Sequence, residues 1–233
     1  SLANITGDAY KVYVIYKKDN VIKCKYTTNA GTNWSTISNL SVNPTTLDAV
    51  YDANGLHITY SINSLSKYYR FTTSWGYAKD VSETESGTNP RIESLTTSNK
   101  IYVVYKNGDN AKSREYDVST NSWADRKTLY SGLNNSYFAG FGVDASYIYL
   151  YYNRWEYEPD PGWHYKFYTR TIRKSDYTTV SISWDKLNDT YNIQTTTTTD
   201  NKVHTAWQYR DVLADGFGDV SLEPGLIHDY FSN

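Results

Sequence analysis

Two stretches of the sequence combine aromatic rings with charged and hydrogen-bonding side chains in a way that suits ligand recognition. The first reads NRWEYEPDPGWHYK (153–166) and the second reads QYRDVLADGFGDVSLEPGLIH (208–228). Flat aromatic rings with polar edges suit the faces of sugar rings, and neighbouring arginine, histidine and carboxylate groups bond to hydroxyls or to a carboxylate. The candidate ligand-binding residues are Arg154, Trp155, Trp163, His164, Arg210 and Asp211.

The elements that must position these residues repeat along the chain. Five strand-like segments end in an aromatic residue, with steps of 44, 45, 47 and 55 residues between the aromatics Tyr16, Tyr60, Tyr105, Tyr152 and Trp207. A second aromatic follows each of them, at Tyr26, Phe71, Tyr116, Tyr168 and Tyr230. One further candidate strand precedes each pair, and a short fourth strand follows it. Four short strands in about 45 residues are typical of a β-propeller blade.

The pattern within one strand supports this fold. Ile101, Val103 and Tyr105 point to one side and Tyr102 and Val104 to the other, so both faces are apolar, as in a sheet packed on both sides. We therefore predict an all-β, five-bladed β-propeller that forms a single domain over residues 1–233. The expected blades are approximately 1–42, 43–87, 88–132, 133–183 and 184–233, and the last has no room for its own fourth strand after Tyr230.

Two repeats break the regular spacing. The two aromatics of a repeat are 10, 11 and 11 residues apart in the first three units, but 16 apart in the fourth and 23 apart in the fifth. Both extra segments fall between the second and third strands of neighbouring blades, where long loops on the ligand-binding face are expected. The alternative is that these loops only cover the end of the barrel, with Trp155 and Trp163 packed on each other.

The turn TTNAGTNW (27–34) carries a family resemblance. It resembles the Asp-box of the BNR repeat family, S-x-D-x-G-x-T-W: Gly31 and Trp34 match, and Thr27, Asn29 and Asn33 stand for Ser, Asp and Thr. A second turn, YDVSTNSW (116–123), keeps the tryptophan and also looks like a kelch turn. The resemblance implies a structural box, in which a side chain bonds to its own turn and the tryptophan packs between blades, on the face opposite to the ligand site.

The same resemblance raises a sialidase hypothesis. Sialidases of this type need three arginines, a Tyr–Glu nucleophile pair and an Asp acid/base, and the segment Asn89-Pro90-Arg91-Ile92 occupies a place that suits the first arginine. Its order, P-R-I, is also common in plain BNR repeats, and those enzymes have six blades where this repeat predicts five. We assign no catalytic residues.

The histidines do not suggest a zinc site. His57 and His204 each stand three residues before a strand-end aromatic, in a position that other repeats fill with tyrosine, which predicts packing in the core. His228 has no partner at zinc spacing. Asp215 and Asp219 have the close spacing of calcium ligands, but supply too few of them. We expect no metal or cofactor, with calcium as the alternative.

Composition limits the class of protein. The net charge of −2 argues against nucleic-acid binding, and no apolar run reaches membrane-spanning length. The lone Cys24 is expected to be a buried, inert thiol. The lack of methionine and of a signal peptide predicts a segment of a longer product. Five Asn-X-Ser/Thr sequons favour an extracellular or cell-surface location: Asn4, Asn33, Asn39, Asn134 and Asn188.

These observations predict an extracellular carbohydrate-binding or adhesion module whose partner is a glycan or another cell-surface ligand. Its ligand surface is expected on the face with the long segments of the fourth and fifth blades. One alternative is a glycoside hydrolase, either sialidase-like or five-bladed. Another is an architectural domain of a surface protein. Fold alone does not decide between them.

Overall fold

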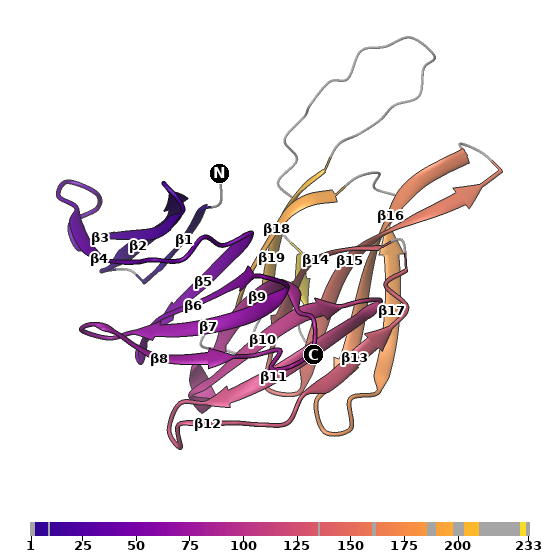
Figure 1. Cartoon of the computed structure of the whole chain (residues 1–233). Coiled ribbons are helices and arrows are strands. Elements are labelled where there is room, and N and C mark those ends of the chain that lie inside the picture. Colours follow the sequence, from indigo (N-terminus) through magenta and orange to yellow (C-terminus); the bar gives the residue numbers. More distant parts are fainter. Residues whose placement is uncertain are drawn as a thin grey trace, which may run out of the picture. The chain divides into compact units, whose positions relative to one another are not determined.

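The computed structural model describes residues 3–8, 10–134, 136–159, 162–185, 190–197, 203–209 and 229–231 (Figure 1). These residues form β-strands joined by turns, with one short 3₁₀ helix, η1 (Thr96–Ser98), and no α-helix. By its internal contacts the chain divides into two compact units, residues 1–127 and 128–233. None of the described residues belongs to a helix long and apolar enough to cross a membrane.

The first unit contains three antiparallel sheets whose strands follow the order of the chain. The first sheet comprises β1 (Ala3–Gly7), β2 (Val12–Lys18), β3 (Val21–Thr27) and β4 (Ser35–Leu40). The second comprises β5 (Thr46–Asp52), β6 (Gly55–Ile62), β7 (Leu65–Phe71) and β8 (Trp75–Asp80). The third includes β9 (Thr88–Leu95), β10 (Lys100–Asn107), β11 (Asn110–Asp117) and β12 (Ser122–Trp123).

The second unit begins within β13 (Lys127–Ser131) and contains two more antiparallel sheets. One comprises β14 (Ser136–Val143), β15 (Tyr147–Glu158), β16 (Gly162–Arg173) and β17 (Thr179–Asp185). The other has three strands among the described residues: β18 (Thr190–Thr197), β19 (Val203–Tyr209) and β20 (Asp229–Phe231). The N-terminal strand β1 pairs with β2 of its own sheet.

Within each unit, successive sheets pack through their first strands. β1 contacts β5 and β5 contacts β9 in the first unit, and β14 contacts β18 in the second. Small antiparallel sheets that follow one another along the chain and pack in this way are the organisation of a β-propeller. The predicted all-β propeller fold is therefore confirmed. One ring of five blades, with the repeat boundaries given above and a single domain over residues 1–233, stays a prediction.

The strands form where the sequence alternates and both faces are apolar. In β10, residues 101–105 are all buried, so this strand is covered on both sides, as its pattern predicted. Tyr60, Tyr105 and Tyr152, three of the strand-end aromatics, are each no more than 2% exposed. In the second unit, Gly142 of β14 lies against Val203 of β19, and a Cβ atom at this glycine would come within 2.3 Å of the valine side chain. Glycine therefore permits the close approach of these two strands.

The turn at residues 27–34 is held by its own side chains. Thr27 Oγ1 accepts the Gly31 N–H at 3.1 Å, and Asn29 Oδ1 accepts the Asn33 N–H at 2.9 Å and the Thr27 hydroxyl at 2.8 Å. Gly31 has a φ of +87°, in the left-handed region that favours glycine. The predicted bonding of side chains to their own turn is confirmed.

The two box tryptophans differ in their packing. We expected both to pack between blades, and for Trp34 this is wrong: its side chain is 43% exposed and lies over Gly31 of its own turn. Trp123 agrees with the prediction. It stacks on Tyr116 of its own sheet at 5.0 Å between ring centroids and meets Tyr68 of the preceding sheet edge-on at 5.2 Å. Trp75 also links two sheets, because its Nε1–H donates to the Ser38 carbonyl of β4.

Candidate functional site

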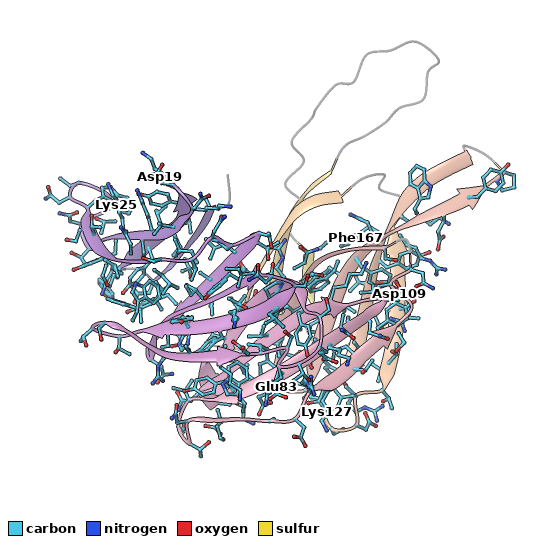
Figure 2. All side chains as sticks on the ribbon, viewed as in Figure 1. Asp19, Lys25, Glu83, Asp109, Lys127 and Phe167 are labelled. Carbon is cyan, nitrogen blue, oxygen red and sulfur yellow. The ribbon has the colours of Figure 1, made fainter. Side chains whose placement is uncertain are left out.

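The inserted segment of the fourth repeat forms a β-ribbon, which corrects the expected long loop. β15 and β16 remain paired from Tyr147↔Arg173 to Glu158↔Gly162, and the ribbon is visible in Figure 1 as two strands that continue beyond their sheet. The neighbouring strand β14 pairs with β15 only as far as Arg154, and β17 pairs with β16 only as far as Phe167. Beyond these residues the ribbon has two strands. Phe167, near the base of the ribbon, is labelled in Figure 2.

The ribbon has two chemically different faces. Side chains alternate along a strand, and directly paired residues of antiparallel strands share a face. Trp155 and Tyr157 therefore lie on one face, where their side chains are 39% and 62% exposed. The register pairs Tyr157 with Trp163 and Trp155 with Tyr165, so four aromatic positions share this face. We call these four positions the aromatic face.

The opposite face carries charges around Glu156. Its carboxylate lies 3.4 Å from Arg154 Nε and 3.7 Å from Lys166 Nζ. Burial and a hydrogen bond to Glu156 raise the pKa of Tyr168 above its ordinary value. Glu156 is thus shared by Arg154, Lys166 and Tyr168 on this face.

A tyrosine stack anchors the base of the ribbon on its charged side. The rings of Tyr152 and Tyr168 are 5.2 Å apart and 9° from parallel, and Tyr130 stacks on Tyr152 at 5.4 Å. The guanidinium of Arg170 lies 3.8 Å from the centre of the Tyr130 ring and donates to the Tyr152 hydroxyl at 3.4 Å. Such stacking and cation–π contacts stabilise the sheet at the base of the ribbon.

The six predicted ligand residues do not all meet on one surface. Arg154 and Trp155 are neighbours in β15 and therefore lie on opposite faces of the ribbon. By register, position 163 falls on the face of Trp155 and position 164 on the face of Arg154. Arg210 and Asp211 lie outside the described residues, as do Asp215 and Asp219, the possible calcium ligands. Elsewhere, no group of three or more His, Cys, Asp or Glu side chains in the described residues could hold a metal ion.

His57 has a structural role, as its place in the repeat predicted. The side chain is fully buried, with Nε2 3.1 Å from Asp52 Oδ1 and Nδ1 2.7 Å from the Tyr68 hydroxyl. The Ser94 hydroxyl of the next sheet donates to Asp52 Oδ2 at 2.6 Å. Burial acts to raise the pKa of Asp52, but hydrogen bonds from His57 and Ser94 outweigh it and hold this pKa below its ordinary value. The network ties β5, β6 and β7 to β9.

Arg91, the residue of the sialidase hypothesis, lies in β9 beside a buried carboxylate. Asp48 of β5 accepts the N–H of Ile92 at 3.0 Å. Burial raises the pKa of Asp48, and the nearby Arg91 offsets part of this rise. The carboxylate therefore connects the first strands of two successive sheets.

Comparison with known proteins supports the fold. No model of a known protein family matches the chain, and no curated protein does either. Among solved structures, the chain is similar to Xyloglucan PUL GH43B of Bacteroides ovatus, with a TM-score of 0.57 and 12% identity over 98% of this chain and 55% of that protein. It is also similar to an endo-arabinase of Bacteroides thetaiotaomicron, with a TM-score of 0.55 and 8% identity over 99% of this chain and 94% of that one.

A third similar structure has a different kind of function. The hydrazine synthase of Kuenenia stuttgartiensis matches with a TM-score of 0.58 and 9% identity, over 90% of this chain and 64% of that protein. The chain thus spans only about half to two thirds of the length of two of these three proteins. Likeness at such low identity establishes the architecture, and the chain has the β-propeller fold.

Proposed function

We propose that this propeller binds carbohydrate and that the aromatic face of the β15–β16 ribbon is its contact surface. The observation that carries the proposal is the pair Trp155 and Tyr157, two residues apart on one face of a ribbon that extends beyond its sheet. Aromatic side chains are ordinarily buried in a core. Two exposed rings on one face of a paired strand offer flat stacking surfaces for sugar rings, with polar edges for their hydroxyls.

The geometry of the ribbon favours an extended ligand. Residues two apart on a strand are separated by roughly 6.6 Å, twice the rise per residue. Trp155 and Tyr157 therefore present their rings in series along the strand. Positions 163 and 165 continue the same face on β16. We propose that the surface takes a chain of several sugar units.

Two of the structurally similar proteins support the ligand class. They are described as a xyloglucan-locus GH43 protein and an endo-arabinase, names that refer to polysaccharides. The hydrazine synthase shows that the fold also serves other chemistry, so the ribbon, rather than the fold, is the basis of the proposal. Glycan binding at or outside the cell surface would agree with the exposed sequon asparagines Asn33, Asn39 and Asn134.

A glycan array tests the function with the 233-residue chain and a Trp155→Ala/Tyr157→Ala double variant. We expect the parent to bind one class of oligosaccharide and the double variant to lose that binding, with unchanged circular dichroism. Equal binding by both proteins would refute the proposed surface. If no glycan binds, the proposed function itself is wrong.

The glycoside hydrolase alternative is separated from a binding module by activity. A panel of aryl glycosides, incubated with the parent chain, would release the aryl alcohol if the chain were a glycoside hydrolase. We expect no release above a heat-denatured control. Release that a purified chain sustains through many turnovers would replace the binding module by an enzyme.

A further inference from the structure

The first unit contains an open groove that none of the sequence patterns indicated. Its volume is about 750 Å³, within the roughly 300–1,000 Å³ of small-molecule sites. The groove lies at the turn between β6 and β7 and at the end of β8, and Val42, between β4 and β5, also lines it. All of the described residues that line it belong to the first unit. Glu83, labelled in Figure 2, is one of its lining residues and follows β8.

Aromatic and apolar side chains form part of the groove lining. Tyr60 of β6 is 2% exposed and stacks on the partly buried Tyr69 of β7, with 6.1 Å between ring centroids and 29° between planes. Val42 and Ile62 are partly buried and pack against the same hydrophobic core. The ring of Tyr69 is therefore held in a fixed orientation beside the groove.

Charged side chains add hydrogen-bonding groups of both kinds. Lys67 pairs with Asp80, and Lys79 Nζ lies 3.8 Å from Glu83 Oε1. These four side chains are 26%, 48%, 35% and 36% exposed, in that order. Lys67 and Asp80 are directly paired and share the face of Tyr69, so these two can meet a ligand beside its ring. Glu83 also pairs with Arg114, at 2.6 Å, and with Arg126, at 3.6 Å.

The balance of these groups selects a ligand class. Two ammonium groups supply donors and two carboxylates supply acceptors, so the four lining charges cancel. An anion would meet Asp80 and Glu83, a cation would meet the lysines, and an apolar ligand would remove the polar groups from water without replacing their bonds. Hydroxyl groups donate and accept, so a neutral polyhydroxylated ligand satisfies both kinds.

We propose that this groove is a second, separate saccharide site, which takes one or two units of a neutral sugar chain beside Tyr69. The inference rests on the proposed function for the ligand class, but on different residues and a different sheet. The protein would then bind sugar chains at two places, one in each unit.

Two variants test the groove by removing different properties. Ala78 is an exposed residue of the edge strand β8 and lines the groove, so Ala78→Trp places bulk in it. Thr36→Trp is the matched control, because Thr36 is an exposed residue of another edge strand, β4, and is not among the lining residues. The double variant Lys67→Met/Asp80→Leu removes the donor and the acceptor together, a change that leaves no single charge unpaired.

The measurement is isothermal titration of the 233-residue chain with neutral xylo-, arabino- and galacto-oligosaccharides of three to six units, and with a galacturonate oligosaccharide. We expect two binding events for one neutral series. Ala78→Trp and Lys67→Met/Asp80→Leu should each weaken one event at least tenfold, while Thr36→Trp leaves both. Trp155→Ala/Tyr157→Ala should remove the other event.

The outcomes separate the groove from the ribbon. A single event that only the ribbon variant removes overturns the groove and keeps the proposed function. A single event that only the groove variants remove supports the groove and refutes the ribbon as the contact surface. If galacturonate binds at the groove in preference to the neutral sugars, the neutral ligand class is overturned. If none of the probes binds, both sites are overturned.

Discussion

Replacing Trp123 by alanine should destabilise the protein by about 3 kcal/mol, because this side chain joins two sheets of the first unit. Its ring contacts Tyr116 at 5.0 Å and Tyr68 at 5.2 Å, and each such pair contributes roughly 0.5–1.5 kcal/mol beyond area burial. The guanidinium of Arg114, 5.6 Å from the Trp123 ring, adds about 0.5–1 kcal/mol. Together with the lost burial, the sum falls near the lower end of the 3–5 kcal/mol typical of buried aromatics.

The matched variant is Trp34→Ala. Trp34 occupies the same place in the other turn but is 43% exposed, so we expect a loss of about 1 kcal/mol. Thermal unfolding followed by circular dichroism measures both, and about 3 kcal/mol corresponds to a Tm lower by roughly 6–12 °C in a chain of this size. Equal losses for the two variants, or a larger loss for Trp34→Ala, would refute the packing described for these turns.

Three further expectations follow from buried groups and from the ribbon. Asp52→Asn should lower stability by about 1–3 kcal/mol at pH 7. Because the pKa of Asp52 is lowered in the folded protein, its contribution to the free energy of unfolding is present above the unfolded pKa of about 3.9 and is lost as pH falls through the folded pKa. In urea unfolding, the stability difference between the parent and Asp52→Asn should therefore be smaller at pH 3 than at pH 7. Burial raises the pKa of Cys24 to about 12, so a thiol reagent at pH 8 should label this residue only after the protein unfolds. Rapid labelling of the native protein would contradict the burial of this thiol. Trp163→Ala should weaken glycan binding at least tenfold, as a residue of the aromatic face, and an unchanged affinity would restrict that face to β15.

The strand order could be predicted because each repeat carries the same local pattern. Alternation of apolar residues and the recurring strand-end aromatics, such as Tyr60 and Tyr105, identify the second strand of a sheet without knowledge of its neighbours. The side-chain bonds of the 27–34 turn are also local, since Thr27 and Asn29 bond within seven residues of chain. These features depend on residues that are close together in the sequence, so they can be predicted without knowing how the chain folds elsewhere.

The ribbon was misread although its signal was present. Trp155 and Tyr157 alternate with Arg154 and Glu156, which is the period-two pattern of a strand. The longer repeat spacing predicts a loop, whereas this alternation predicts a strand with Trp155 and Arg154 on opposite faces. Because Arg154 and Trp155 are adjacent in a strand, they cannot belong to the same ligand-binding face.

The groove and the exposure of Trp34 could not be read from the chain. The groove brings together Tyr60, Lys67 and Asp80 from three strands, with Val42 from the connection before β5. Tyr60, Lys67 and Asp80 are brought together by the register of β6, β7 and β8 within one sheet, and Val42 comes from the connection outside that sheet. The exposure of Trp34 depends on the distance between its turn and the neighbouring sheet.

The most direct test of carbohydrate binding by the aromatic face compares two adjacent residues of β15. Titration calorimetry of the best glycan from the array would be carried out with the parent, Trp155→Ala and Arg154→Ala. The proposed surface predicts at least a tenfold loss of affinity for Trp155→Ala, or about 1.4 kcal/mol, and less than a twofold change for Arg154→Ala on the opposite face. Loss of affinity with Arg154→Ala and none with Trp155→Ala would contradict it.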